Sequence, residues 1–148
     1  MKNYRLLLIV MLVAVFAGCA TPTPASTPTL VAVTPEKVVT PVDLALDVAP
    51  ETVEELRLAG AATIVDVREI SEYDTGHIPG AVLIPLGELP NRLDEVPTDV
   101  PVVMVCRSGN RSTQALQLLQ KEGFTNVHNM VGGMNAWAAA GYEIEAVR

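Results

Sequence analysis

Basic residues are scarce in this chain of 148 residues. It holds 10 Lys and Arg against 17 Asp and Glu, for a net charge of −7, and no stripe of Lys and Arg forms an electrostatic footprint for nucleic acid. Aromatic residues are scarce too, with three Tyr, two Phe and one Trp, so the chain lacks stacking platforms for single-stranded bases. The composition argues against a nucleic-acid partner.

Cysteine and histidine are almost absent. The two cysteines, Cys19 and Cys106, are too few for a disulfide framework or a cysteine-based zinc site. The two histidines, His77 and His128, lie far apart in the sequence and have no i, i+4 relation on a helix. We therefore expect no metal site.

The longest apolar run lies near the N-terminus, where Leu6 to Ala17 are uninterrupted apolar residues after a short basic region. A membrane-spanning helix needs about 20 such residues, so this shorter run suits the core of a signal peptide, which we assign to residues 1–18. The following "FAGC" resembles the lipobox of bacterial lipoproteins, although Phe16 stands where that motif usually has an aliphatic residue. The resemblance implies that Cys19 becomes the lipidated first residue of the mature chain; the alternative is an ordinary secreted protein.

Residues 19–42 combine the candidate lipidation site with a segment rich in Thr and Pro. Proline lacks an N–H donor and fixes φ, which favours an extended, solvated chain. At about 3.1 Å per residue this tether would reach roughly 70 Å. We therefore expect an extracytoplasmic lipoprotein, in the periplasm or at the cell surface, whose lipid anchors a folded domain at residues 43–148 to a membrane.

Short apolar runs alternate with amphipathic stretches after residue 43. The apolar runs are rich in β-branched residues and predict strands at 44–48, 62–67, 101–106 and 124–130. The amphipathic stretches, each closed by a glycine, predict helices at 50–60, 111–123 and 134–141. Strands that alternate with helices over about 100 residues predict an α/β domain with a parallel sheet.

Three conspicuous side chains in this part have structural interpretations. His77 follows a glycine at a turn, where a hydrogen-bonding role is favoured over catalysis. His128 lies in a strand-like stretch and is interpreted as a partly buried strand residue. Trp137 is expected to pack the last helix onto the core.

The stretch "CRSGNRS", residues 106–112, directly follows a predicted strand. In an open α/β sheet this junction lies at the carboxyl edge of the strands, where ligands bind. The next helix offers free N–H groups, Gly109 lets successive amides face inward, and Arg107 and Arg111 add positive charge. Because each of these features lowers a thiol pKa, the pattern indicates that Cys106 is a reactive thiolate rather than an inert core thiol.

Three segments, in order, resemble the signatures of the rhodanese (thiosulfate sulfurtransferase) domain. They are "IVDVREISEYDTGHIPGAVLIPL" at 64–86, the loop "CRSGNRS" at 106–112 and "NMVGGMNAWAAAGYEIE" at 129–145. Together they cover essentially all of residues 45–145. The resemblance implies a three-layer α/β fold, with a mostly parallel central sheet of about five strands flanked by helices.

The resemblance also implies roles for individual residues. Cys106 would be the nucleophile that accepts a sulfane sulfur and holds it as a persulfide. Asp66 and Arg68 would brace the loop from the neighbouring strand, and Arg107 would help to bind the thiosulfate anion. No cofactor is implied, because aligned N–H dipoles can stabilise a persulfide anion. The residues that would cradle the outer sulfur and bind substrate are Arg107, Ser108, Gly109, Asn110, Arg111 and Ser112.

Three other functions compete with sulfur transfer. Phosphatases and arsenate reductases of this fold carry Cys-x5-Arg, whereas Arg111 makes a shorter Cys-x4-Arg loop and Ser112 occupies the position of the longer loop's arginine. A sulfur carrier or binding module that depends on a partner would also keep Cys106. A thiol redox enzyme would lack a resolving cysteine. We therefore expect a monomeric sulfurtransferase that takes sulfur from a thiosulfate-like donor and passes it to a thiol or cyanide acceptor.

Overall fold

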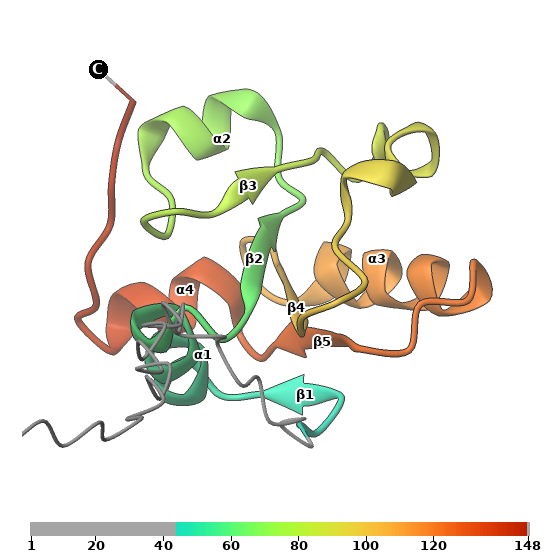
Figure 1. Ribbon diagram of the computed structural model, residues 1–148. Coiled ribbons are helices and arrows are strands. Elements are labelled where there is room, and N and C mark those ends of the chain that lie inside the picture. The colour runs from blue at the N-terminus through green and yellow to red at the C-terminus, as the bar shows by residue number, and fades with distance from the viewer. Residues whose placement is uncertain (1–43, 148) are drawn as a thin grey trace, which may run out of the picture. The chain divides into compact units, whose positions relative to one another are not determined.

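The computed structural model describes residues 44–147, which form a sheet with helices against both faces (Figure 1). The predicted signal peptide, Cys19 and the tether lie outside the described residues, so their assignments stay predictions. Within residues 44–147, no helix has the length and apolar character needed to span a membrane.

The sheet has five strands in the order β1-β5-β4-β2-β3, and every neighbouring pair is parallel. The expected α/β fold with a parallel sheet is thereby confirmed. The predicted strand at 44–48 is shorter than expected, and the short β3 was not predicted. The strands are β1 (Asp47–Val48), β2 (Thr63–Asp66), β3 (Val82–Leu83), β4 (Val102–Val105) and β5 (Val127–Met130).

In residues 44–147, four α-helices surround the sheet, and two short 3-10 turns, Leu89–Asn91 and Leu93–Glu95, follow β3. Three of the helices are at their predicted places, while α2 was not predicted, since it is short and buries none of its side chains fully. The helices are α1 (Pro50–Ala59), α2 (Ile70–Thr75), α3 (Asn110–Lys121) and α4 (Gly133–Ala139).

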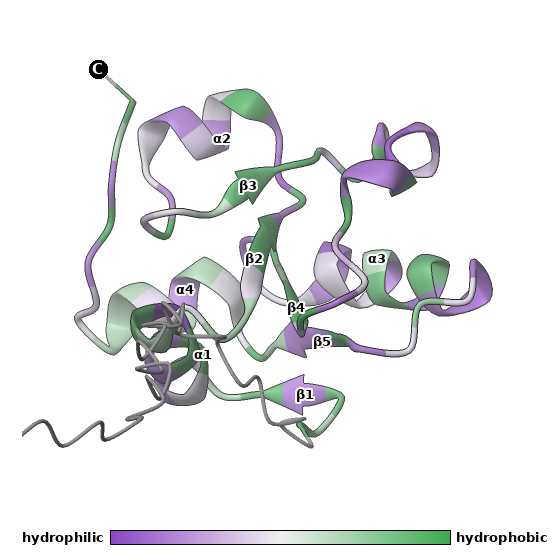
Figure 2. Ribbon diagram, viewed as in Figure 1, coloured by the Kyte–Doolittle hydropathy of each residue, from purple (hydrophilic) through white to green (hydrophobic). Residues whose placement is uncertain are grey.

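Apolar side chains fill a layer on each face of the sheet. On one face, Ala115, Leu116 and Leu119 of α3 pack against side chains of β2 and β4. On the other face, Val53 of α1 and Trp137 of α4 pack against the opposite sides of the same strands. Figure 2 shows the hydrophobic colour along β2, as expected for a strand covered on both faces. Trp137 is fully buried, which confirms its predicted packing role.

Both histidines take structural positions. The Nδ1 atom of His77 lies 2.9 Å from the carbonyl oxygen of Tyr73, and the two rings stack with centroids 3.6 Å apart. His128 is buried in β5, with its Nδ1 atom 2.8 Å from the carbonyl oxygen of Ala45. His77 thus makes the hydrogen bond that was expected of it, and His128 is a strand residue as predicted, although it is more deeply buried than expected.

The parallel strands bring β2, β4 and β5 to one edge of the sheet at their carboxyl ends. Asp66 ends β2, Cys106 directly follows β4, and Gly132, the N-cap residue of α4, ends the short turn after β5. Segments that are distant in the sequence therefore meet at this edge, and the candidate site is built there.

Candidate active site

Cys106 lies where β4 passes into α3 and is only 1% exposed. The chain turns at Gly109, whose φ of 100° lies in the left-handed region that glycine adopts without strain. This turn brings the Gly109 N–H back over the loop, where it donates to the Cys106 Sγ atom at 3.1 Å. The thiol therefore lies under a backbone amide, as the loop sequence indicated.

The N-terminal end of α4 fixes the orientation of the first two peptide groups in this loop. The amide of Met134 donates to the carbonyl of Cys106 at 2.8 Å, and the amide of Asn135 donates to the carbonyl of Arg107 at 3.0 Å. In a trans peptide the N–H points opposite to the carbonyl, so holding the Arg107 carbonyl toward α4 directs the next amide, that of Ser108, away from α4.

Gly133 is what allows α4 to approach the loop so closely. A Cβ atom at this position would lie 2.2 Å from the Cys106 carbonyl oxygen and 2.8 Å from the Ser108 nitrogen, both too close for any side chain. Its φ of +57° also disfavours other residues. The Gly-Gly pair of the third motif therefore has a packing reason at the active loop.

Ser112, fully buried in the first turn of α3, places its hydroxyl 3.4 Å from the Cys106 Sγ atom. Burial raises the pKa of the Cys106 thiol, but a hydrogen bond from the Ser112 hydroxyl lowers it. The amides of Ser112, Ser108 and Gly109 lower the pKa further, so that it lies below that of an ordinary cysteine. Amides and a hydroxyl thus favour the thiolate of Cys106.

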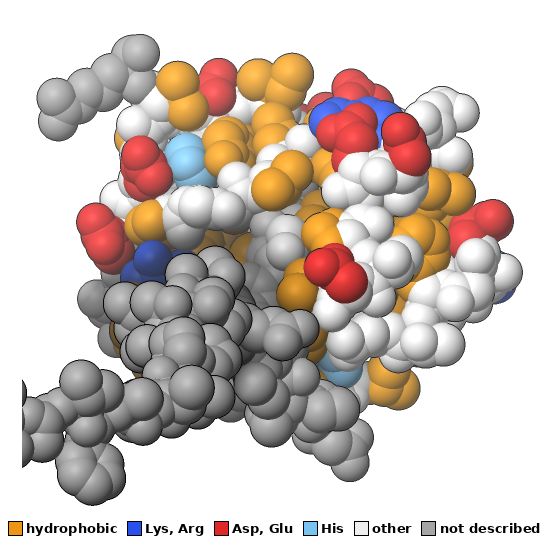
Figure 3. Space-filling model, viewed as in Figure 1, with side chains coloured by type: hydrophobic (Ala, Val, Ile, Leu, Met, Phe, Trp, Pro, Cys, Tyr) orange, Lys and Arg blue, Asp and Glu red, His pale blue; other side chains and the backbone are white. Residues whose placement is uncertain are grey.

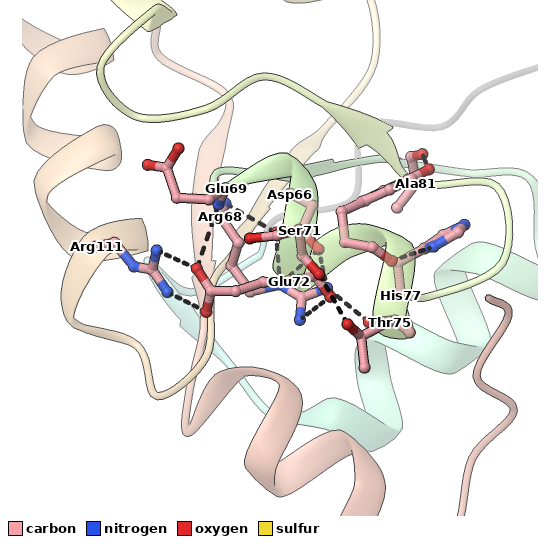
Figure 4. Close-up of polar contacts among 11 residues, drawn as sticks. Asp66, Arg68, Glu69, Ser71, Glu72, Thr75, His77, Ala81 and Arg111 are labelled. Atoms are coloured by element: carbon pink, nitrogen blue, oxygen red, sulfur yellow. Dashed lines mark hydrogen bonds and ion pairs between the residues drawn. The ribbon is translucent and has the colours of Figure 1, made fainter. Parts of the chain in front are cut away.

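Arg111 has a carboxylate partner that the sequence did not reveal. Its two terminal nitrogens lie 2.7 and 2.8 Å from the two carboxylate oxygens of Glu72 in α2, a bidentate pair seen in Figure 4. This pairing is the main reason that the pKa of Glu72 falls to about 2. Arg111 was expected to strengthen the field of the loop; in the structure its charge is largely compensated by Glu72, and it ties the loop to α2.

Asp66 and Arg68 form a buried ion pair next to this contact, with the Arg68 Nη2 atom 2.6 Å from the Asp66 carboxylate. Arg68, which Figure 4 shows next to Asp66 and Glu72, also donates to the carbonyl oxygens of Gly76 at 2.8 Å and of Glu72 at 3.4 Å. Its contacts therefore hold α2 rather than the loop itself. The support that was expected from this pair reaches the loop indirectly, through the Glu72–Arg111 contact.

The remaining loop side chains lie at the surface. Arg107, Ser108 and Asn110 are all exposed. Within residues 44–147, Arg107 is the arginine without a side-chain partner, whereas Arg57, Arg68, Arg92 and Arg111 each bind a carboxylate. Figure 3 shows that acidic side chains outnumber basic ones on the face that it presents. Arg107 is therefore a cation beside the loop that is available to an anionic ligand.

Some contributors to the site had no role in the sequence prediction. Glu72 was part of the first motif, but its distance of 39 positions from Arg111 gave no sign of their contact. Asn129 was also part of a motif, and its Oδ1 atom lies 2.6 Å from the Ser112 hydroxyl. The consecutive glycines after β5 were a usable signal of a close backbone approach.

No group of three or more His, Cys, Asp or Glu side chains that could hold a metal ion occurs in the part of the chain that the structure describes. The groups that face the Cys106 sulfur are N–H and O–H donors. Such a site can stabilise an anion on sulfur and can present a thiolate as a nucleophile.

The region around this site matches known proteins. A family model described as "Rhodanese-like domain" matches residues 49–140. The Bacillus subtilis protein named "Putative sulfur carrier protein YrkF" is 47% identical over 74 residues, which span 50% of this chain and 40% of that protein. The Allochromatium vinosum protein named "Sulfurtransferase" is 43% identical over 83 residues, which span 56% of this chain and 78% of that protein.

Solved structures match in the same region. A rhodanese-related protein from Thermoplasma volcanium superposes with a TM-score of 0.64 at 28% identity, covering 70% of this chain and 100% of that one. Thiosulfate sulfurtransferase from Pseudomonas aeruginosa gives a TM-score of 0.64 at 32% identity, covering 69% of this chain and 20% of that one. The fold implied by the three sequence motifs is thus found in both.

Proposed function

Because the chain belongs to the family of rhodanese-like domains, we propose that it is a sulfurtransferase, which carries a sulfane sulfur from a thiosulfate-like donor to a thiophilic acceptor as a persulfide on Cys106. The observation that carries this proposal is the Gly109 amide 3.1 Å from the Cys106 Sγ atom, with the Ser112 hydroxyl 3.4 Å from the same sulfur. Proteins named as a sulfurtransferase and as a sulfur carrier are among the chain's relatives.

The proposed reaction has two displacements at sulfur. The Cys106 thiolate attacks the outer sulfur of thiosulfate, a bond forms between the two sulfur atoms, and sulfite leaves with the electron pair of the broken S–S bond. The negative charge of the resulting persulfide lies on its outer sulfur. An acceptor nucleophile then attacks this sulfur, and Cys106 leaves again as the thiolate, so no external oxidant or reductant is consumed.

The surrounding residues have distinct parts in this proposal. The amides of the loop stabilise the anion on sulfur, and the Ser112 hydroxyl can donate to Sγ in the thiolate form. Arg107 holds the charged end of the donor at the mouth of the loop, with Ser108 and Asn110 as neighbouring polar groups. Because Cys106 is almost completely buried, a slim donor that can reach the floor of the loop is favoured.

The geometry of Arg111 favours sulfur over phosphate as the transferred group. An enzyme that binds a tetrahedral oxyanion in such a loop needs a guanidinium directed at that anion. Both terminal nitrogens of Arg111 instead bind Glu72. This contact agrees with the short Cys-x4-Arg spacing, which leaves a cradle suited to a single sulfur atom.

A second candidate is a sulfur carrier that is loaded by a partner protein. The name of the Bacillus subtilis relative supports it, although this chain spans only 40% of that protein's length. A carrier would use the same Cys106 persulfide and the same amides. It would differ in its donor, which would be a protein persulfide rather than thiosulfate.

We also propose that the protein acts outside the cytoplasm, anchored to a membrane by a lipid on Cys19. This proposal rests on the apolar run and the "FAGC" motif of the N-terminus. Metabolic labelling with radioactive palmitate in a bacterial host would test it. We expect label in the wild type and none in Cys19→Ser; an unlabelled wild-type protein would contradict the lipid anchor.

The function is tested by intact mass spectrometry of the full chain after incubation with thiosulfate. We expect a gain of about 32 Da, one persulfide sulfur, in the wild type and no gain in Cys106→Ala. The variant retains Cys19, which controls for sulfur bound elsewhere. Loading by a protein persulfide but not by thiosulfate would favour the carrier, and loading of Cys106→Ala would refute the assignment of Cys106.

A further inference from the structure

A line of hydrogen bonds connects the thiol to the edge of the sheet. The Asn129 side chain in β5 donates from Nδ2 to the Asp47 carboxylate of β1 at 2.7 Å. The Ser112 hydroxyl of α3 lies 2.6 Å from Asn129 Oδ1 and 3.4 Å from Cys106 Sγ. Asn129 is 5% exposed, and Ser112 is fully buried. Asp47 is exposed, so the line runs from the surface to the sulfur.

The Ser112 hydroxyl has one proton for several neighbouring acceptors. One of them, the Gly109 carbonyl oxygen at 3.0 Å, already accepts from the amide of Thr113 at 3.0 Å and from its hydroxyl at 2.8 Å. The effective competition is therefore between Asn129 Oδ1 and Cys106 Sγ. When the hydroxyl donates to one of these atoms, it cannot donate to the other.

Asp47 decides which end of the Asn129 amide faces Ser112. A carboxylate only accepts hydrogen bonds, so it holds the NH₂ end of the amide toward itself. The oxygen end must then face the Ser112 hydroxyl. Because Asn129 is buried, its oxygen depends on this hydroxyl, and losing the hydrogen bond leaves it poorly satisfied.

The position of negative charge on sulfur changes what Ser112 should do. A thiolate carries its charge on Sγ and attracts the hydroxyl proton away from Asn129. A persulfide carries its charge on the outer sulfur, so Sγ no longer needs the proton and Asn129 can keep it. The Asp47–Asn129 pair thus destabilises the thiolate, because it competes for the Ser112 proton. It does not destabilise the persulfide, whose Sγ carries no charge.

We propose that Asn129, oriented by Asp47, is a positioning residue that competes with Cys106 for the Ser112 proton and thereby favours the sulfur-loaded form over the bare thiolate. The part of this proposal that concerns the loaded form rests on the proposed function. The competition for the proton does not, because it concerns the thiol alone.

Other charges lie around the sulfur and have to be separated from this effect. Arg107 belongs to the loop, and Arg111 is paired with Glu72 of α2. The Asp66–Arg68 ion pair lies at the end of β2. None of these groups is changed by substituting Asn129, whose side chain carries no charge. Substituting Asp47 does remove a charge, so that variant needs a background in which the hydrogen-bond route is closed.

The test is the pH dependence of Cys106 alkylation by iodoacetamide in the full chain, which reports the pKa of the thiol without any sulfur transfer. We expect Asn129→Ala and Asp47→Ala each to lower this pKa by about half a unit to one unit, because the Ser112 proton is freed for the thiolate. The two substitutions thus probe the exposed end of the line and its buried middle, and Asp47→Ala at the surface does not threaten folding. Cys19→Ala in every protein leaves one thiol to titrate.

Ser112→Ala provides the decisive control. In that background the shift from Asn129→Ala must vanish, and Asp47→Ala must retain no more than the effect of its lost charge. A pKa that is unchanged by Asn129→Ala, or a shift that persists without the Ser112 hydroxyl, would overturn the proposal.

The loaded form is measured separately, at equilibrium in a mixture of thiosulfate and sulfite. We expect the ratio of persulfide to thiolate to fall about three- to tenfold in Asn129→Ala, since a pKa shift of one unit corresponds to a factor of about ten. If the pKa shifts occur but the wild type does not load, the proposed function fails while the competition for the proton stands. If the wild type loads and the ratio does not change, the preference for the loaded form is refuted.

Discussion

Replacing Gly133 with alanine tests whether the N-terminal end of α4 holds the active loop in place. The new Cβ atom would lie 2.2 Å from the Cys106 carbonyl oxygen and 2.8 Å from the Ser108 nitrogen, whereas real Cβ atoms essentially never approach closer than 3.0 Å. The loop and α4 must therefore separate by roughly 1 Å. This displacement would break both hydrogen bonds from the Met134 and Asn135 amides to the loop.

The cost can be worked out from the contacts that are lost. The amides of Met134 and Asn135 lose their bonds to the loop carbonyls, at about 1 kcal/mol each. The left-handed φ of Gly133 adds about 1 kcal/mol for any residue with a Cβ atom. We expect the free energy of unfolding to fall by about 3 kcal/mol. A displacement of about 1 Å at the nucleophile should also slow sulfur loading about a hundredfold.

Gly141→Ala is the matched control, because Gly141 has a φ of +76° but no neighbouring atom within 4 Å of the place that a Cβ atom would take. Gly141→Ala has the cost of a left-handed φ without a steric clash, so its free energy of unfolding should fall by only about 1 kcal/mol. Urea unfolding followed by the fluorescence of the buried Trp137 measures stability, and single-turnover loading from thiosulfate measures activity. The reasoning is refuted if Gly133→Ala is as stable as Gly141→Ala and loads sulfur at the wild-type rate.

Two further predictions concern charges near the loop. The folded-state pKa of Glu72 is about 2, below its ordinary value of 4.5. The pair with Arg111 therefore stabilises the fold fully above pH 4.5, and this contribution is lost as the pH falls toward 2. Glu72→Gln should cost roughly 1 kcal/mol at pH 7, given the partial exposure of the pair, and should flatten the acid dependence of urea unfolding in that window; an unchanged acid profile would contradict this. Arg107→Gln should raise the KM for thiosulfate about tenfold. It should leave the free energy of unfolding unchanged, because the Arg107 guanidinium has no side-chain partner within residues 44–147. Lys121→Gln at the far end of α3 should change neither quantity, and equal effects of the two substitutions on KM would refute a binding role for Arg107.

The loop at Cys106 could be predicted because its determinants are local. An apolar run, a cysteine, a glycine and a helix start follow one another within a short stretch, and each has a direct structural consequence. The same holds for α1, where Pro50 and Gly60 mark the two ends of the helix. In such segments the residues that set the geometry are neighbours in the sequence.

The helix α2 could not be predicted in the same way. It has no fully buried side chain, so its sequence lacks the apolar period that marks a surface helix. It is held instead by a capping box between Glu69 and Glu72 and by the Arg68 bonds to the carbonyls of Glu72 and Gly76. These are polar contacts that depend on how the surrounding chain is folded.

Partners of charged and polar side chains were the least predictable part of the site. Arg111 could have served as a free cation, and only the position of α2 gives it Glu72. From the sequence, Ser112 is an ordinary residue of a first helical turn. In the structure it forms a hydrogen bond with Asn129, 17 positions away, and Asn129 forms one with Asp47, 82 positions away. Such pairings follow from the order of the strands, which brings β1 beside β5 and β5 beside β4.

The most direct test of the central claim follows sulfur through Cys106 in one turnover. The full chain is loaded with thiosulfate, freed of excess donor and treated with cyanide, while thiocyanate is assayed and the peptide that contains Cys106 is analysed by mass spectrometry. We predict that thiocyanate appears in a one-to-one ratio with the loss of about 32 Da, one persulfide sulfur, from that peptide. Thiocyanate formed while the Cys106 peptide never carries the extra sulfur, or undiminished turnover by Cys106→Ser, would contradict the account.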